Sequence, residues 1–155
     1  MKSNSGITII EMTLYIGIVA LISSSLVGLY IEIIKLKSKA TAIQEVNETI
    51  RLAASKIEYE IKSAHSIISV GSSLSLAFTD SSRNPTTIAL DNGRIRFSVG
   101  SSIAYITSNL VNINTFTLTN LSSGDTLSQH VRYTLSGTYL GNSASITGSA
   151  EVRSK

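Results

Sequence analysis

The chain lacks cysteine and tryptophan and has a single proline among its 155 residues. Without cysteine it can form neither a disulfide nor a thiolate metal site, so its fold must depend on core packing and partners. The two histidines, His65 and His130, lie far apart and at no metal-ligand spacing. No nucleophile, phosphate-binding or dinucleotide motif occurs. We therefore expect no catalytic residue, no metal and no cofactor, and the sequence does not predict an enzyme.

Charge is also scarce. The formal net charge is +3, which is too small to indicate a nucleic-acid partner. Arg94 and Arg96 would project from one face of a strand and are the only candidates for a nucleic-acid contact. Grooves that bind single strands also use stacking aromatic residues, and none is interleaved with these arginines in the sequence. A solvated strand face is the simpler interpretation, with DNA binding kept as an alternative.

The longest feature is an uncharged run from Met12 to Ile31, between Glu11 and Glu32. As a helix it spans about 30 Å, the thickness of a hydrocarbon core. A buried core helix is an alternative, but a chain this short can hardly bury a helix that is apolar all round. A removable signal cut after Ser25 would leave a secreted β domain. The length of the run and the carboxylate of Glu11 favour a membrane-spanning helix instead.

Glu11 is the only charge near the start of this run. A carboxylate in a membrane segment costs about 2.5–3.5 kcal/mol on insertion scales, so a sequence that keeps one there is expected to use it. A helix N-terminus favours a negative charge, and pairing with a cation would offset the cost of burial. The alternative is a carboxylate that reaches the interface without a partner.

Gly6, the segment Ile7-Thr8-Ile9-Ile10-Glu11 and the run behind them resemble the cleavage and methylation motif of type IV pilins and type II secretion pseudopilins. The resemblance covers about a dozen residues, and Ile7 replaces the phenylalanine usual in the family. It implies that a prepilin peptidase cuts after Gly6, that Ile7 is N-methylated, and that Glu11 guides assembly with other pilin or pseudopilin subunits. Gly28 stands where major pilins often have proline, which fits a minor subunit.

A second, shorter resemblance concerns the subclass. The segment 106–111, the strand after it and the closing strand at Tyr133 resemble J-type minor pseudopilins and W-type minor pilins. The family resemblance also implies a single-pass protein of the inner (cytoplasmic) membrane with an extracytoplasmic head, later part of a periplasmic or cell-surface filament. Lys35, Lys37 and Lys39 favour the opposite orientation by the positive-inside rule. A membrane-anchored module that binds DNA or an exported substrate remains the alternative function.

Beyond the run, apolar residues continue at helical spacing and predict an amphipathic helix that packs on a sheet. The predicted stripe is Leu36, Ala40, Ile43, Asn47, Ile50, Ala54, Ile57, Ile61, Ala64 and Ile68. A homodimeric coiled coil is the competing interpretation. With the run before it, this stripe predicts a long helix that spans a membrane in its first half.

The remainder alternates as strands do. Asn92-Gly93 between alternating runs predicts a two-residue hairpin that pairs Leu90 with Ile95 and sets Asp91 opposite Arg94. A phase slip between Thr115 and Phe116 predicts a bulge. Runs around Tyr133 and Ile146 predict a closing hairpin with its turn at Gly141-Asn142.

These observations predict an α+β protein, with a long N-terminal helix packed on a mainly antiparallel β-sheet head. The predicted organisation is a leader at 1–6, a transmembrane helix at 7–34, an amphipathic helix at 35–66 and a β head at 67–155.

Overall fold

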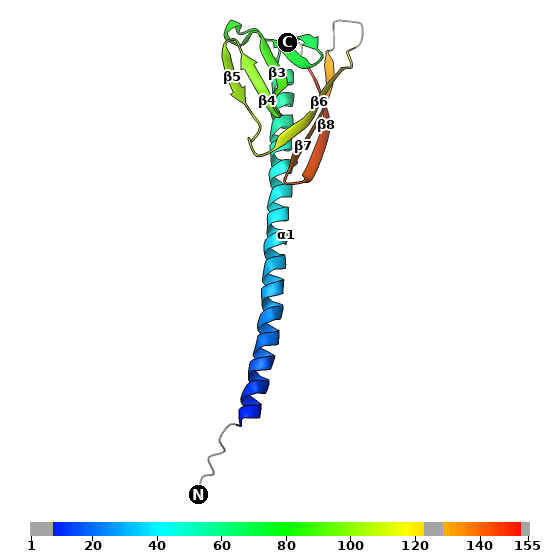
Figure 1. Ribbon diagram of the computed structural model, residues 1–155. Helices are drawn as coiled ribbons and strands as arrows, with labels where there is room; N and C mark the ends of the chain where they lie inside the picture. Colours follow the sequence, from blue (N-terminus) through cyan, green and yellow to red (C-terminus); the bar gives the residue numbers. More distant parts are fainter. Residues whose placement is uncertain (1–7, 123–128, 153–155) are drawn as a thin grey trace. The chain divides into compact units, whose positions relative to one another are not determined.

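The computed structural model describes residues 8–122 and 129–152 (Figure 1). Contacts divide the chain into two compact units, residues 1–40 and 41–155, which we describe separately. One 55-residue helix, α1 (Ile9–Ser63), contributes to both units, and the strands all belong to the second. The predicted α+β class, with a long N-terminal helix and antiparallel sheets, is confirmed.

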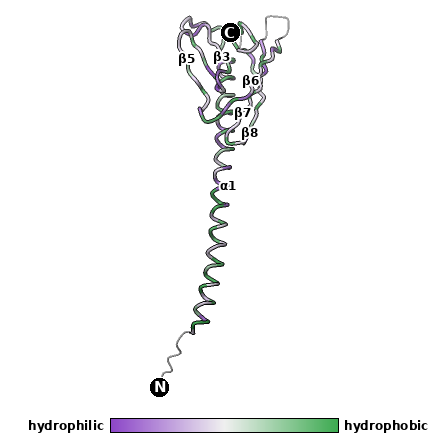
Figure 2. The backbone as a smooth tube through the Cα atoms, in the orientation of Figure 1, coloured by the Kyte–Doolittle hydropathy of each residue, from purple (hydrophilic) through white to green (hydrophobic). Residues whose placement is uncertain are grey.

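The described part of the first unit is the N-terminal portion of α1. Its side chains are exposed from Ile9 to Ala40, and most of them are apolar up to Ile34, as Figure 2 shows. Over 18 residues the mean hydropathy reaches 2.1, and none of that window is buried. This helix is long and apolar enough to cross a membrane. A signal sequence near the N-terminus can have the same length and composition.

The second unit contains two antiparallel sheets. In the five-stranded sheet the order is β1 (Ser66–Val70), β2 (Ser73–Ala77), β3 (Thr86–Asp91), β4 (Arg94–Val99) and β5 (Ser102–Tyr105). The three-stranded sheet follows, in the order β6 (Asn112–Asn120), β7 (His130–Tyr139) and β8 (Asn142–Glu151). Consecutive strands are neighbours in both sheets, so short connections suffice throughout.

The hairpin of β3 and β4 has the predicted register. Leu90 pairs with Ile95 and Asp91 with Arg94. Asn92 and Gly93 both have positive φ, 49° and 73°, which a two-residue turn of this kind requires and which asparagine and glycine tolerate. The prediction from Asn92-Gly93 is confirmed in both turn and register.

The bulge and the closing hairpin occur close to their predicted places. The register of β6 shifts between Ile113 and Thr115, so the extra residue is Asn114 and the bulge comes slightly before the predicted slip between Thr115 and Phe116. Its side-chain amide donates to the hydroxyl of Thr138 at 3.3 Å, which gives the irregular position a polar partner.

In the closing hairpin, β7 and β8 pair through ten residues each. Its turn is Leu140-Gly141, one residue earlier than predicted, with φ of 46° and 77°.

Two strands were not predicted. Helix α1 ends at Ser63, and β1 begins at Ser66 inside the segment predicted as helix up to residue 66. Ile68, predicted as the last member of the helical stripe, is therefore a strand residue and is exposed. Strand β5 is short and exposed at every position, so it lacks the alternation of buried and exposed residues that reveals a half-buried strand.

The core lies where α1 packs on both sheets. It combines helix residues such as Ile57 and Ile61 with strand residues such as Leu74, Ile95 and Leu135, all fully buried. Ile50, Ala54, Ile57, Ile61 and Ala64 confirm the C-terminal half of the predicted stripe.

In the N-terminal half of the stripe, the prediction was wrong for the positions that belong to the second unit. Ile43 and Asn47 were predicted to face the head, but both are exposed. Ala42, Val46, Thr49 and Ala53 are buried in their place. These residues form a second line on the helix, about one position away from the predicted one. Two sheets cover a wider arc of α1 than the single apolar stripe indicates.

Candidate functional site

Helix α1 starts with a side-chain cap at Thr8. The Thr8 hydroxyl accepts a hydrogen bond from the N–H of Glu11 at 3.3 Å, and the Thr8 carbonyl accepts from the N–H of Met12 at 3.2 Å. Threonine followed three residues later by glutamate is the pattern of a capping box. Thr8 followed three residues later by Glu11 is the signal in the sequence from which this cap can be predicted. The cap fixes Glu11 in the first turn of the helix.

Glu11 is exposed, and the described side chains around it are uncharged and mostly apolar. Ile9 and Ile10 are 85% and 80% exposed, and the next charged residue along the helix is Glu32. Among the described residues, the structure shows no partner for the Glu11 carboxylate. The predicted processing residues, Gly6 and Ile7, lie outside the described residues.

Arg94 and Arg96, the candidate nucleic-acid contacts, both have partners within the protein. The Arg94 guanidinium donates to the carbonyl oxygen of Thr107, at 3.3 Å from Nε and 3.0 Å from Nη2. Arg96 forms an ion pair with Asp91 at 3.4 Å. Asp91 and Arg94 are register partners as predicted, but the ion pair is made by Arg96. A carboxylate beside the two arginines weakens this face as a phosphate site.

No aromatic residue is interleaved with these arginines in the sequence, but the neighbouring strand brings one beside them in space. Strand β5 pairs with β4, and the register sets Tyr105 opposite Arg96. The Arg94 guanidinium lies 4.4 Å from the centre of the Tyr105 ring. The Tyr105 hydroxyl donates to Asp91 at 2.7 Å, and this bond raises the pKa of that phenol. The aromatic ring therefore holds Arg94 in place within the head.

A buried carboxylate, Glu60, forms a charge cluster in the head. It is 4% exposed and contacts Lys56 at 3.1 Å and Arg83. Arg83 also lies over the ring of Phe78, 4.2 Å from its centre. Because Arg83 belongs to the 3₁₀ turn η1 (Ser81–Arg83), the cluster fastens the β2–β3 connection to α1. We assign it a structural role.

The turn before Arg83 follows the predicted turn chemistry. The Asp80 carboxylate accepts from the N–H and the hydroxyl of Ser82, at 2.9 and 2.8 Å. The side-chain and backbone hydrogen bonds from Ser82 lower the pKa of Asp80. The polar loop at 80–84 is therefore explained by its own hydrogen bonds.

A second polar pair, between the buried Tyr133 and the half-buried Glu58, joins the three-stranded sheet to α1. Tyr133, 1% exposed, donates to Glu58 at 2.7 Å, and its hydroxyl also lies 3.4 Å from the carbonyl of Ala54. Burial and the bond to Glu58 raise the pKa of the Tyr133 phenol far above its ordinary value. The phenolic proton of Tyr133 is held in the hydrogen bond to Glu58. We therefore assign Tyr133 a role in packing and not in proton transfer.

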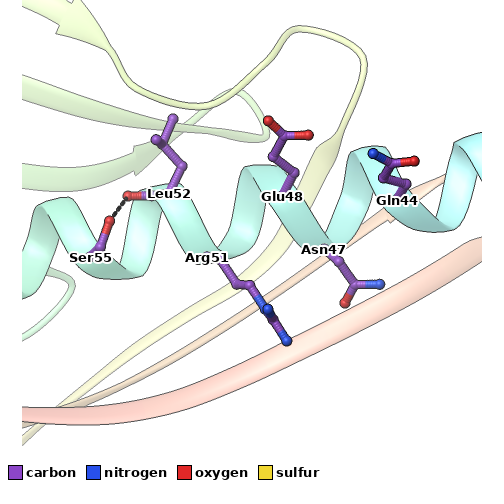
Figure 3. Close-up of a pocket in the computed structure, with 6 residues that line it drawn as sticks. All are labelled: Gln44, Asn47, Glu48, Arg51, Leu52 and Ser55. Atoms are coloured by element: carbon purple, nitrogen blue, oxygen red, sulfur yellow. Dashed lines mark hydrogen bonds between the residues drawn. The ribbon is translucent and has the colours of Figure 1, made fainter.

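Two hollows of the described head lie along the exposed flank of α1. The larger, about 740 Å³, is lined by Gln44, Asn47, Glu48, Arg51, Leu52 and Ser55. Figure 3 shows Arg51 and Asn47 pointing to one side of the helix and Gln44, Glu48 and Leu52 to the other. The polar groups do not converge, so the hollow has no geometry for a small ligand.

Residues that could bind metal do not cluster in the part of the chain that the structure describes. No group of three or more histidine, cysteine, aspartate or glutamate residues occurs among residues 8–122 and 129–152. His65 is exposed in the connection between α1 and β1, and its N–H donates to the carbonyl of Ala77 at 2.8 Å. His130 begins β7.

No family model, no curated protein and no solved structure matches this chain. The architecture itself, a long apolar N-terminal helix packed on antiparallel sheets, is pilin-like.

Proposed function

We propose that this chain is a structural subunit, a minor pilin or pseudopilin, that enters a filament through α1. The observation that carries the proposal is Glu11, which has no partner among the described residues and lies at the capped start of an exposed apolar helix. In water such a helix would expose an apolar surface far beyond the patches that soluble monomers tolerate. Lipid or neighbouring helices are the environments that suit it.

Glu11 then needs a cation at membrane depth. The amine that cleavage after Gly6 would create on Ile7 lies one helical turn away in sequence. In a staggered array of subunits, the amine of one chain can meet the Glu11 carboxylate of the next. Such a pair offsets the burial cost of both charges, and it gives Glu11 a role in assembly without chemistry of its own.

The head supports a structural role because several of its charges, among them both candidate nucleic-acid contacts, are paired internally. Arg94, Arg96, Arg83 and Glu60 each have partners inside the head. In a DNA-binding head, Arg94 and Arg96 would be available to phosphates instead. We therefore place the subunit's activity in α1, with no catalysis and no cofactor, and with prepilin peptidase, other subunits and the inner membrane as partners.

The minor-subunit assignment rests on α1 and on one loop. Helix α1 is continuous through Gly28, where the resemblance expects proline in major subunits. The segment that resembles J-type and W-type subunits connects β5 to β6. Its Thr107 is buried, and the Thr107 hydroxyl accepts from the N–H of Ile95 at 3.0 Å.

N-terminal mass analysis of the purified protein tests the processing. We expect loss of residues 1–6 and a methyl group on Ile7. An N-terminus at Leu26 would instead indicate a secreted β domain, and an intact Met1 would indicate a plain membrane anchor. Either of these results would overturn the proposal.

A pair of variants tests assembly. Glu11→Ala should insert into the membrane and fail to enter filaments, because the cation of the neighbour loses its partner. Glu32→Ala is the matched control, since it removes a carboxylate from the other end of the apolar run, and it should assemble normally. Equal filament incorporation of the two variants, measured by immunoblotting of sheared filaments, would exclude Glu11 as the assembly contact.

The orientation is tested by labelling. The chain has no cysteine, so Ser143→Cys in the exposed part of β8 creates a unique thiol. A membrane-impermeant maleimide added to intact spheroplasts should label it if the head is extracytoplasmic. Labelling only after lysis would support the reverse orientation that Lys35, Lys37 and Lys39 favour.

A further inference from the structure

Two hairpins of the head use the same two-residue turn with different residues. Asn92-Gly93 has φ of 49° and 73°, and Leu140-Gly141 has φ of 46° and 77°. Asparagine tolerates a positive φ, whereas for a bulky residue such as leucine it is an outlier. Burial does not compensate this strain, because Leu140 is 67% exposed. A strained position that presents an apolar side chain to the surroundings points to a function.

A second exposed leucine lies at the same end of the head. Asn112, which starts β6, pairs with Thr138 near the end of β7. The β5–β6 connection therefore arrives beside the β7–β8 turn, and its Leu110 is 52% exposed. The N–H of Ile113 donates to the carbonyl of Gly93, which brings the β3–β4 turn to this end as well. We call it the near end; it contains the connections β1–β2, β3–β4, β5–β6 and β7–β8.

The near end is the end at which α1 enters the head, as Figure 1 shows. Helix α1 finishes at Ser63, and the N–H of His65 donates to the carbonyl of Ala77, the last residue of β2. Strand β2 runs away from the β1–β2 connection, so α1 finishes at the opposite, far end. The β2–β3, β4–β5 and β6–β7 connections belong to the far end.

The connections at the near end are uncharged. They are residues 71–72, 92–93, 106–111 and 140–141, and none of these is acidic or basic. The β2–β3 connection at the far end, in contrast, contains Asp80 and Arg83. A charge that enters an apolar phase loses its hydration at a high cost. Exposed leucines on uncharged loops therefore suit an apolar phase, and such patches mark contacts with proteins or membranes.

Chain length keeps the near end beside the membrane, a step that rests on the proposed function. Glu32 is the first charge after the apolar run, and the second unit begins at Thr41. The chain from one to the other spans about 14 Å as a helix and at most about 32 Å when extended. The headgroup region extends about 5–7 Å beyond the hydrocarbon core on each side. The bilayer is therefore the apolar phase within reach of the near end, however the two units are arranged.

We propose that the near end of the head docks on the bilayer surface, with Leu140 and Leu110 as its apolar anchors. The two side chains would enter the boundary between headgroups and acyl chains, where burial of their apolar area is favourable. Docking would hold the head against the membrane before the subunit enters a filament, and assembly would release it.

Quenching by labelled lipids tests docking in the full-length protein, reconstituted in vesicles of phosphatidylethanolamine and phosphatidylglycerol. The chain has no cysteine, so each variant carries a single thiol-linked fluorophore. Ser143→Cys places it close to Leu140 at the near end, and Ser101→Cys places it in the β4–β5 connection at the far end. Both serines are exposed. A nitroxide on the lipid headgroup quenches only a fluorophore that lies at the membrane surface.

Leu140→Asn removes the first anchor and relieves the turn. Asparagine occupies the corresponding place in the β3–β4 turn, so this variant should melt about 4 °C or more above the native protein. Loss of quenching in it then cannot result from unfolding. The matched control is Leu121→Asn, because Leu121 is also exposed, at 41%, but follows β6 at the far end. Leu110→Asn tests the second anchor.

The fluorophore at position 143 should be quenched several times more strongly than the one at position 101. Leu140→Asn should lower the quenching at position 143 to the level at position 101. Leu110→Asn should lower it in part, and Leu121→Asn should leave it unchanged. Equal quenching at the two positions, or full quenching in Leu140→Asn, overturns the proposal.

Two further measurements identify the cause of a negative result. A neighbouring subunit on the near end would protect the fluorophore at position 143 from aqueous iodide as the protein-to-lipid ratio rises, without quenching by the lipid, and this also overturns the proposal. A fluorophore on Ser24→Cys, within the apolar run, reports insertion through nitroxides deep in the acyl chains. Without quenching there, the proposed function fails and the docking inference with it. Quenching there but not at position 143 refutes docking alone.

Discussion

A methyl group at position 148 should strongly destabilise the head. Gly148 lies in β8 directly beneath the ring of Tyr133. A Cβ atom built on Gly148 would lie 2.5 Å from Cζ and 3.0 Å from Cε1 of that ring. Real carbon–carbon contacts need about 3.5 Å or more, so Gly148→Ala forces the ring to move.

The ring of Tyr133 has no free space into which it could move. It is 1% exposed, and its hydroxyl bonds Glu58 at 2.7 Å. Overpacking costs about 1–3 kcal/mol, and loss of a hydrogen bond to a charged group costs about 1.5–3 kcal/mol. Replacing glycine in a strand returns about 0.5–1 kcal/mol of backbone entropy. The net expectation is a loss of about 2–4 kcal/mol.

Thermal unfolding of the full-length protein in detergent, followed by near-ultraviolet circular dichroism, measures this loss. A melting temperature lower by about 10 °C or more corresponds to it for a domain of this size. Ser149→Ala, on the exposed face of the same strand, is the control and should change little.

A second background isolates the contact. In a Tyr133→Leu protein the ring is absent, so Gly148→Ala should cost much less there than in the native sequence. A cost below about 0.5 kcal/mol in the native background, or an equal cost in both backgrounds, would refute the reasoning.

Three further predictions concern the head. Gly93→Ala should cost about 1–2 kcal/mol in urea unfolding, because φ is 73° at this position and a β-carbon is strained there; Ser98→Ala, on the neighbouring strand, should cost less. Arg83→Met should cost about 2–4 kcal/mol, because it leaves the buried Glu60 carboxylate with Lys56 alone, and Glu60→Leu/Arg83→Met should regain most of that loss; no recovery in the double variant would contradict a pairing role. Since the pKa of Tyr133 is raised above the unfolded value of 10.0, its stabilisation should be complete below that pH and decline as the pH rises further; Tyr133→Phe should flatten that decline in alkaline unfolding curves.

The parts of the fold that sequence predicts well are those fixed by local chemistry. Asn92-Gly93 specifies a turn in which both residues need positive φ, and the turn then sets the register of β3 and β4. The two missed strands lack such a signal. Ile67 and Ile68 fit helical spacing as well as a strand, and β5 has no buried face.

The division of the head into two sheets depends on long-range contacts between strands, which the pattern of apolar residues along the sequence does not reveal. The buried line through Ala42, Val46 and Thr49 includes a polar residue and two small or branched ones, which gives a weak helical signal. Likewise, the stacking of Arg94 on Tyr105 depends on the pairing of β4 with β5. A candidate site that looked like free arginines was in fact an internally satisfied cluster.

Glu11 differs from these residues, because its importance is inferred from the free-energy cost of placing a carboxylate in lipid and not from contacts in the structure. The carboxylates of Glu58, Glu60, Asp80 and Asp91 have partners within the head. Glu11 has none among the described residues, and its neighbours on α1 are apolar. In lipid, a carboxylate without a partner costs about 2.5–3.5 kcal/mol on insertion scales. Under the function proposed above, the processed N-terminus of another subunit supplies the missing cation, and the same cost then favours assembly into the filament.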